Sequence, residues 1–455
     1  MNRRVASAFA TALAAVSLAT APSRLPAQNY SPDAEWVSQS VIYEVFVQDF
    51  SPDGLRGVTA GLNRIHSAGA DVIWLMPLQP IGVLNRKGTL GSPYSIRDYH
   101  AIDPSNGTAA DLRALVRAAH ERDMKVILDW VPDHTSWDHA WITGHPDWYV
   151  HDSSGAISVP RDGQGKLTDW TDVAQLDYRN ADLRRAMTDE MRWWLTTYDL
   201  DGFRMDVAGF VAYDYWREAV PALRAAQRRP IMLLAEWGDV ELNRIGFDLT
   251  YGWDGYAKLK EVWRGAPASG FTQQVLGEIR SMPGYHGRLR FTTNHDETHW
   301  DNPPVVLFGG PAQARAAFVA MALLPGRPML YNGQEVEDPH KPQLFEPDPR
   351  VAWDRPGAEQ ARAFYARVLE LARRSSIIGG AYRVLQNSAP DDVISYARGS
   401  TLVLVNTRDR EVQFTVRDRD LMVSGRYDVL NGRVQGGETV TLPAFGAKVL
   451  IPRQT

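Results

Sequence analysis

The chain has 455 residues, of which 44% are hydrophobic, 23% charged and 10% aromatic, as in a soluble globular protein with a large core. Its formal net charge of −5 provides no basic surplus that would favour nucleic acid or an anionic membrane as a partner. The absence of cysteine excludes disulfides, thiolate nucleophiles and zinc–thiolate sites.

The first 28 residues are typical of a secretory signal peptide. Two arginines precede an apolar stretch over residues 5–19, which is too short to span a membrane comfortably. A small-x-small cleavage pattern ends at Ala21, and Ala27 is a second candidate cleavage point. We therefore predict a signal peptide over 1–28 and a periplasmic or secreted mature protein that has no membrane segment after cleavage.

Short apolar runs rich in β-branched residues then alternate with helix-length segments. The predicted strands cover 41–47, 71–77, 125–131, 200–206, 230–236, 247–251, 288–294 and 328–334. Helical patterns between them include 108–123, 180–198 and 310–324. Eight strands that alternate with helices predict an α/β fold in which a parallel sheet closes into a (β/α)₈ TIM barrel.

Two segments interrupt this alternation. Residues 135–178 are rich in turns and aromatic side chains, which predicts a short inserted domain B after the third strand. From residue 379 to 455 only strand and turn patterns occur, which predicts a C-terminal antiparallel β-sandwich domain. The barrel is then divided into a first part over 29–134 and a second part over 179–378.

Four of the predicted strands end in an acid: Asp129, Asp206, Glu236 and Asp296. Active sites of such barrels lie at the C-terminal ends of the strands. Four acids are thus brought to one rim, and His134 and His295 lie next to two of them in the sequence. This arrangement predicts an active site built from carboxylates.

The predicted strand over 200–206 carries a charged pair inside an apolar run. Side chains two residues apart point the same way, so Arg204 and Asp206 share the barrel interior. An adjacent arginine lowers the pKa of a carboxyl group and keeps it ionised, which suits a nucleophile. Glu236 follows the apolar run "IMLLA", and apolar surroundings would raise its pKa and suit it to donate a proton.

Several motifs occur in a familiar order along the chain. They are "DWVPDH" (129–134), "GFRMD" (202–206), "AEWGD" (235–239) and "FTTNHD" (291–296), together with "SPYSIRDYHAIDPSNGT" (92–108) and "GRPMLYNGQE" (326–335). In these motifs the chain, from about residue 41 to its end, resembles the α-amylase family, glycoside hydrolase family 13.

The resemblance implies a retaining mechanism in which Asp206 is the nucleophile and Glu236 is the general acid and then the base. Asp296 would bind sugar hydroxyls and stabilise the transition state. The supporting residues it implies are Tyr94 stacking on the sugar, Arg204 orienting Asp206, Asp129 supporting the arginine, and His134 and His295 bonding sugar hydroxyls. Purely structural roles remain an alternative for Asp129, Asp98 and His134.

The sequence also departs from the family pattern. Many starch-degrading relatives have Lys-His shortly after the nucleophile, where this chain has Gly209 and Phe210. The asparagine that binds calcium in many relatives is Asp133 here. The resemblance implies no cofactor for the chemistry, and a structural calcium ion is an open alternative without a clear site. These departures favour shorter substrates than starch.

We therefore expect a retaining glycoside hydrolase that cleaves α-glucosidic bonds, chiefly α-1,4, in malto-oligosaccharides or related α-glucans. The nearest alternative is a transglycosylase with the same three acids, because a sugar can replace water as the acceptor. A non-catalytic carbohydrate-binding protein on the same scaffold is a second alternative. The expected partner is an α-glucan oligosaccharide, and the sequence does not indicate the oligomeric state.

Overall fold

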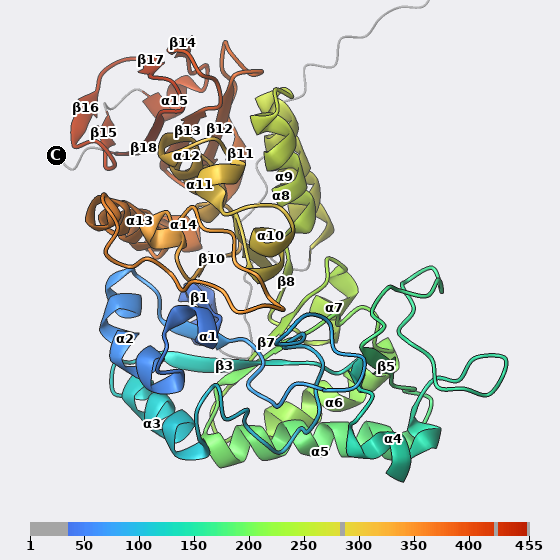
Figure 1. The fold of residues 1–455 in the computed structure, drawn as a ribbon. Coiled ribbons are helices and arrows are strands. Elements are labelled where there is room, and N and C mark those ends of the chain that lie inside the picture. Colours follow the sequence, from blue (N-terminus) through green and yellow to red (C-terminus); the bar gives the residue numbers. More distant parts are fainter. Residues whose placement is uncertain (1–34, 283–286, 423–425, 453–455) are drawn as a thin grey trace, which may run out of the picture.

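The computed structural model describes residues 35–282, 287–422 and 426–452 (Figure 1). The predicted signal peptide over 1–28 lies outside the described residues. Within the described ranges, no helix combines the length and the apolar character needed to cross a bilayer.

A closed parallel barrel of eight strands forms the centre of the molecule, and all eight predicted strands are confirmed. The strand order around the barrel is β1-β10-β9-β8-β7-β6-β3-β2. The strands are β1 (Ile42–Val45), β2 (Val72–Leu75), β3 (Lys125–Trp130), β6 (Gly202–Met205), β7 (Met232–Ala235), β8 (Leu249–Tyr251), β9 (Arg288–Arg290) and β10 (Arg327–Tyr331).

Helices surround the barrel, as a (β/α)₈ fold requires (Figure 1). The longer ones are α2 (Leu55–Ser67), α3 (Ala109–His120), α5 (Ala181–Tyr198), α6 (Tyr213–Ala226), α8 (Trp253–Trp263), α9 (Ala268–Ser281), α12 (Pro311–Ala322) and α13 (Ala358–Ala372). Shorter helices are α1 (Val47–Phe50), α7 (Val240–Ile245), α10 (His295–Trp300), α11 (Pro304–Leu307) and α14 (Ser375–Ile378).

Two of the three predicted helices named above begin at a side-chain cap. Thr108 and Asp111 form a reciprocal capping box at the start of α3. Asn180 accepts two backbone N–H groups at the start of α5, and this helix ends at Asp199 in a left-handed conformation. Local side-chain chemistry therefore sets the bounds of both helices.

The side chains of β6 alternate between the two faces of the barrel wall as predicted. Phe203 points outward and packs edge-on against Trp130 at 5.6 Å between ring centroids, and Trp130 contacts Trp194 of α5. Arg204 points inward, where its Nε donates a hydrogen bond to the Tyr251 hydroxyl at 3.2 Å. The apolar outer face therefore binds the helices, and the charged residue lies inside.

The segment after β3 leaves the barrel and returns at α5. It contains β4 (His134–Ser136) and β5 (Val173–Gln175), which pair antiparallel, with α4 (Ala140–Gly144) and a 3₁₀ turn (Pro146–Trp148) between them. Two loops closed by isolated bridges, over 151–157 and 161–167, project from the body of the molecule (teal in Figure 1).

The C-terminal part is antiparallel, as expected. A six-stranded sheet has the order β11-β12-β13-β18-β15-β16, and β14 and β17 form a separate two-stranded ribbon. Its elements are β11 (Tyr382–Val384), β12 (Val393–Arg398), β13 (Thr401–Asn406), β14 (Val412–Thr415), α15 (Arg419–Met422), β15 (Arg426–Asp428), β16 (Arg433–Gln435), β17 (Thr439–Leu442) and β18 (Ala447–Pro452).

Alternating side chains bury both faces of the six-stranded sheet. In β13, Leu402 and Leu404 pack in a cluster with Phe414 of the two-stranded ribbon. Val403 and Val405 point the other way and join the core of the barrel and its helices. The C-terminal sheet, red in Figure 1, therefore lies between its own ribbon and the barrel helices α9 and α12.

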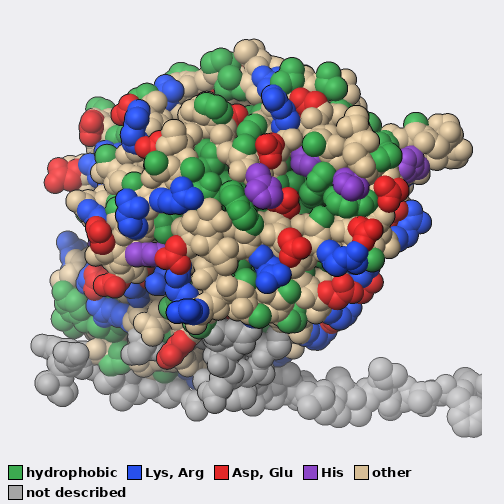
Figure 2. Space-filling model, turned by 90° about the horizontal axis from the view of Figure 1, so that it is seen from below, with side chains coloured by type: hydrophobic (Ala, Val, Ile, Leu, Met, Phe, Trp, Pro, Cys, Tyr) green, Lys and Arg blue, Asp and Glu red, His purple; other side chains and the backbone are tan. Residues whose placement is uncertain are grey.

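Acidic and basic side chains are interspersed on the face of the molecule shown in Figure 2. This face presents no extended patch of one charge.

Candidate active site

The three acids expected to carry the chemistry come together at the C-terminal rim of the barrel. Asp206 and Glu236 are the first residues beyond β6 and β7, and Asp296 is the second residue of α10, which follows β9. All three line one cavity of about 350 Å³. The other residues lining it are Lys87, Ser92, Tyr94, His134, Asp169, Trp170, Asp172, Val173, Val207, Trp300, Leu344 and Phe345.

Arg204 lies beneath this cavity, is fully buried, and contacts three carboxylates. Its Nη1 lies 2.8 Å from Asp129 and 2.7 Å from Asp206, and its Nη2 lies 2.9 Å from Glu236. The pairing with Asp206 was expected, whereas the contact with Glu236 was not. One guanidinium therefore fixes the positions of both acids that a two-carboxylate mechanism needs.

Glu236 is the acid whose surroundings favour the protonated form. Burial raises its pKa to about 8; Arg204 opposes the shift and Asp206 adds to it. This rise of the pKa is the one expected from the apolar residues that precede Glu236 in the sequence. The other carboxyl oxygen, Oε2, accepts the backbone N–H of Val207 at 2.7 Å. Val207 has φ 37°, an unfavourable value for a β-branched residue, and this strained backbone directs its N–H at Glu236.

Both ring nitrogens of His295 have protein partners in addition to the predicted contact with a sugar, which stays a prediction. Nδ1 lies 2.5 Å from Glu44, and Nε2 lies 2.7 Å from the Tyr94 hydroxyl and 3.3 Å from Asp296. Burial alone would lower the pKa of His295, but Asp296 and Glu44 raise it well above its usual value. In this structure His295 is a buried cation that positions its neighbours.

The contact between His295 and Asp296 also changes the pKa of Asp296. Burial would raise the pKa of this acid, but protonated His295 lowers it to about 2. Asp296 is thus held ionised while Glu236 is held protonated at neutral pH. The cavity therefore holds an ionised carboxylate together with a carboxyl group that can donate a proton.

Asp129 and Tyr94 connect the carboxylates around Arg204 with His295 and its partners. The Tyr94 hydroxyl donates to Asp129 Oδ2 at 3.0 Å, and Trp74 Nε1 donates to the same oxygen at 3.1 Å. Asp129 itself is fully buried and does not line the cavity. It therefore supports Arg204 from below, whereas Tyr94 reaches both the network and the cavity.

Sequence reasoning missed Glu44, Trp74 and Tyr251 as members of this network. Glu44 lies inside the apolar strand β1, which is the same signal that singled out Arg204 in β6. A lone carboxylate in "VIYEVFV" could therefore have been found. Trp74 and Tyr251 carry no such signal, because aromatic residues in a buried strand are ordinary core.

His134 lies at the edge of the cavity, at the start of β4. Its Nδ1 is 3.3 Å from Asp133. Burial lowers its pKa, but the hydrogen bond and charge of Asp133 outweigh burial and raise the pKa above its usual value. Among the described residues, no group of three or more acidic, histidine or cysteine side chains is placed to hold a metal ion, and Asp133 instead pairs with His134.

Gly209 and Phe210 belong to an aromatic cluster on the Glu236 side of the cavity. Phe210 stacks with Trp170 at 5.9 Å and meets Trp237 edge-on at 5.3 Å between ring centroids. A Cβ atom at Gly209 would lie 2.2 Å from the Trp237 ring. The glycine therefore makes room for the tryptophan, and a lysine would not fit there without displacing it.

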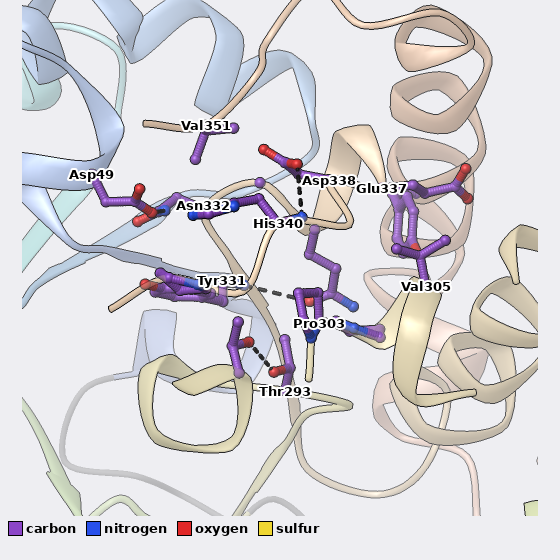
Figure 3. Close-up of a pocket in the computed structure, with 16 residues that line it drawn as sticks. Asp49, Thr293, Pro303, Val305, Tyr331, Asn332, Glu337, Asp338, His340 and Val351 are labelled. Carbon is purple, nitrogen blue, oxygen red and sulfur yellow. Dashed lines mark hydrogen bonds between the residues drawn. The ribbon is translucent and has the colours of Figure 1, made fainter. Parts of the chain in front are cut away.

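A second, smaller cavity of about 30 Å³ lies behind the rim (Figure 3). Asp49 and Asn332 face each other at its wall, with Asn332 Nδ2 donating to Asp49 at 2.9 Å. Asn332 also accepts the backbone N–H of Phe46 at 2.7 Å. The cavity is too small for a sugar, and its polar wall ties β10 to the start of α1.

Comparison with known proteins agrees with this geometry. The model of the α-amylase catalytic domain matches residues 41–161 and 166–232. The α-amylase MalA of Haloarcula japonica is 27% identical over 436 residues, covering 90% of this chain and 61% of the relative. An α-glucosidase of Pediococcus pentosaceus is 32% identical over 204 residues, covering 38% of this chain and 35% of that protein.

Solved structures agree over a larger share of their length. The noncanonic maltogenic α-amylase AmyB of Thermotoga neapolitana superposes with a TM-score of 0.80 at 27% identity, covering 91% of this chain and 98% of its own. An α-amylase from Lactobacillus plantarum has the same TM-score at 29% identity, covering 91% of this chain and 99% of its own.

The (β/α)₈ barrel with carboxylates at its C-terminal rim and the antiparallel C-terminal sheet give the chain the fold of these α-amylase structures. The chain is similar to the α-amylase family, whose catalytic-domain model matches it over the two ranges given above. It spans 61% and 64% of the length of two of its curated relatives, MalA and α-amylase 3 of Dictyoglomus thermophilum.

Proposed function

We propose that the protein is a retaining glycoside hydrolase that cleaves α-glucosidic bonds, chiefly α-1,4, in malto-oligosaccharides or related α-glucans. The observation that carries the proposal is the shared contact of Arg204 with Asp206 and Glu236 beneath a cavity of about 350 Å³. Relatives named α-amylase and α-glucosidase support the substrate class.

The chemistry follows from the positions of Asp206 and Glu236, which both contact Arg204. Asp206, beside the guanidinium, attacks the anomeric carbon, while Glu236 gives its proton to the departing glycosidic oxygen. The bond from the anomeric carbon to that oxygen breaks as the bond to Asp206 forms. Glu236, now ionised, takes a proton from water, which displaces Asp206 and restores both carboxyl groups. Asp296 stabilises the positive charge that develops on the sugar.

The proposal is tested with maltoheptaose and p-nitrophenyl maltoside as substrates. We expect Asp206→Asn to lower the rate of sugar release by roughly 10³-fold or more, because the nucleophile is lost. The exposed surface variant Asp182→Asn serves as the control and should retain full activity. Equal release by the wild type and Asp206→Asn would contradict the proposal and favour a non-catalytic binding protein.

Transfer to a second sugar is a further candidate outcome of the same intermediate. The aromatic cluster of Trp170, Phe210 and Trp237 favours it, because aromatic faces on the Glu236 side give an acceptor sugar a surface to stack on. Chromatography of products from concentrated maltotriose separates the two outcomes. Products longer than the substrate indicate transfer, and only shorter ones indicate hydrolysis.

We also propose that the protein acts outside the cytoplasm. The support is the sequence pattern over residues 1–28. Cell fractionation with N-terminal sequencing tests this proposal. We expect a processed chain that begins between residues 22 and 29 in the periplasm or medium, and an unprocessed cytoplasmic chain would contradict it.

A further inference from the structure

The loop after β2 contains a segment, residues 80–91, that we call the β2 strap. Arg86 fixes its shape from within, because Nε donates to the Gly82 carbonyl at 2.8 Å and Nη2 donates to the Ile81 carbonyl at 3.3 Å. The strap is therefore a folded element with its own internal hydrogen bonds.

One end of the strap is joined to the loop after β10. The backbone N–H of Leu90 donates to the Phe345 carbonyl at 2.8 Å, and that of Thr89 donates to Glu346 Oε1 at 3.1 Å. A Cβ atom at Gly88 would lie 2.6 Å from the Phe345 carbonyl oxygen, so the two backbones meet at a distance that glycine allows. The loops after β2 and β10 thus form one continuous wall.

The strap is also joined to the segment inserted after β3. Lys87 Nζ donates to the Asp169 carbonyl at 2.8 Å and pairs with the Asp172 carboxylate at 3.3 Å. Lys87, Phe345, Asp169 and Asp172 all line the cavity that contains the three acids. The strap is therefore part of the wall of the candidate active site and connects its two flanks.

The position of this wall relative to Glu236 follows from the order of the strands. In the barrel, β2 and β10 are the two neighbours of β1, and β7 lies directly across from β1. Glu236 follows β7, so the junction of the strap with residues 345–346 stands across the cavity from the proton donor, while Lys87 reaches from the strap to the segment that carries Trp170.

The leaving group of the proposed reaction must lie beside the acid that protonates it, on the β7 side. The sugar that becomes bound to Asp206, and any units attached to its non-reducing end, then extend toward the strap. The wall limits how many units can be placed there. The whole cavity has a volume of about 350 Å³, which is close to the lower end of the roughly 300–1,000 Å³ range of ligand pockets.

We propose that the enzyme is exo-acting: the β2 strap closes the non-reducing side of the site, so that cleavage releases short units from the non-reducing end of an α-glucan. This inference rests on the proposed function, and it determines which end of the chain is recognised. Lys87 and Gly88 are its specificity-determining residues, because they hold the strap against the two flanking segments.

The test uses the full chain and two substrates labelled with a fluorophore at the reducing end. One is maltoheptaose, and the other is maltoheptaose blocked at its non-reducing end by a 4,6-O-ethylidene group. We expect the free substrate to shorten by one or two units at a time, and the blocked substrate to react about 100-fold more slowly because the block collides with the wall.

Similar rates on both substrates, with labelled products of every length from the first time point, would overturn the inference and leave the proposed function standing. Failure to cleave either substrate would overturn the proposed function and the inference with it. The two failures are therefore distinguishable in one chromatogram.

Two variants test the strap itself. Lys87→Ala removes the tether to residues 169–172, and Gly88→Val forces the strap away from Phe345. We expect each to raise the rate on the blocked substrate relative to the free one by about tenfold or more, since the steric exclusion is relaxed. Lys166→Ala, an exposed lysine in the neighbouring loop, is the matched control and should leave the ratio unchanged.

An unchanged ratio in both strap variants, with circular dichroism showing that each is folded, would also overturn the inference. It would mean that the strap does not set the limit on substrate length.

Discussion

At the scale of single residues, Arg204 controls the electrostatics of the candidate site, because three carboxylates share its charge. Shared among three partners, one cation does not keep all of them ionised. Burial therefore prevails at Glu236, whereas Asp296 has its own cation in His295. Of the two acids, the proton donor is the one that shares the Arg204 cation with other carboxylates.

This distribution of charge predicts the pH dependence of the reaction. Glu236 must be protonated to act as an acid, and its pKa is raised to about 8, so kcat/KM should fall as the pH rises through 8. The pH profile of the wild type with p-nitrophenyl maltoside measures this basic limb. In Glu236→Gln the residual activity should no longer show it, and a limb that persists unchanged would assign the acid elsewhere.

A second prediction at this scale concerns stability. Burial raises the pKa of Asp49 to about 7, so the folded state binds this proton more tightly than the unfolded chain does. The associated stability is present below pH 4 and is lost as the pH rises from about 4 to about 7. Asp49→Asn keeps an oxygen for the Asn332 amide and cannot ionise.

We therefore expect Asp49→Asn to be more stable than the wild type at pH 8 by on the order of 2 kcal/mol, with little difference at pH 4. Urea unfolding at the two pH values measures this difference. If the unfolding free energies of the two proteins differ by the same amount at pH 4 and pH 8, Asp49 does not titrate in this range.

Residues that the sequence could identify were those whose chemistry conflicts with their surroundings. Arg204 and Asp206 were found because charges stand out in an apolar strand. The second contact of Arg204, with Glu236, could not be found because it depends on the register between β6 and β7. The partners of His295 were missed for the same reason, since Glu44 lies 251 positions away in the sequence.

At the scale of elements, the strands and helices were predictable because apolar periodicity and capping residues are local signals. The β2 strap was not, because residues 80–91 take their position from contacts with two other loops. Its sequence is rich in turn-forming residues and has no period of its own. Loops that acquire their function by meeting one another leave little trace in local sequence.

The loop after β6 gives a prediction at the same scale. Gly209→Ala places a methyl group 2.2 Å from the Trp237 ring and should destabilise the fold by about 1–3 kcal/mol. Gly277→Ala in α9 is the matched control, because no atom lies within 4 Å of its added methyl group. The free energy of unfolding of that variant should rise by about 0.5–1 kcal/mol, as expected when alanine replaces glycine in a helix.

Chemical denaturation of the two variants measures both changes. A neutral Gly209→Ala would mean that Trp237 moves freely. The aromatic cluster would then not be a fixed surface for an acceptor sugar.

At the scale of the whole molecule, the barrel and the C-terminal sheet share one core. Tyr396 in β12 donates its hydroxyl to the Ala320 carbonyl of α12 at 3.0 Å. Arg398 Nη1 donates to the Leu323 carbonyl at 3.2 Å, just beyond that helix. Buried residues of β13 and β18 belong to the same apolar cluster as the barrel. The sheet therefore completes the outer layer of the barrel.

We consequently expect calorimetry to record one cooperative unfolding transition for the full chain. Tyr396→Phe should lower the temperature of that transition by removing a buried hydrogen bond of about 1 kcal/mol, without splitting it. Two separate transitions would contradict the shared core. They would show that the C-terminal sheet unfolds on its own.

The pairing of β1 with β10 has a consequence for how the chain is made. Ile42 lies opposite Met329, so the first strand has no second neighbour until almost three quarters of the polypeptide has left the ribosome. Synthesis runs at roughly 5–20 residues per second. Until β10 has been made, the incomplete sheet keeps two open edges. Open strand edges are templates for pairing with other chains, so the nascent barrel is exposed to aggregation until β10 has been added.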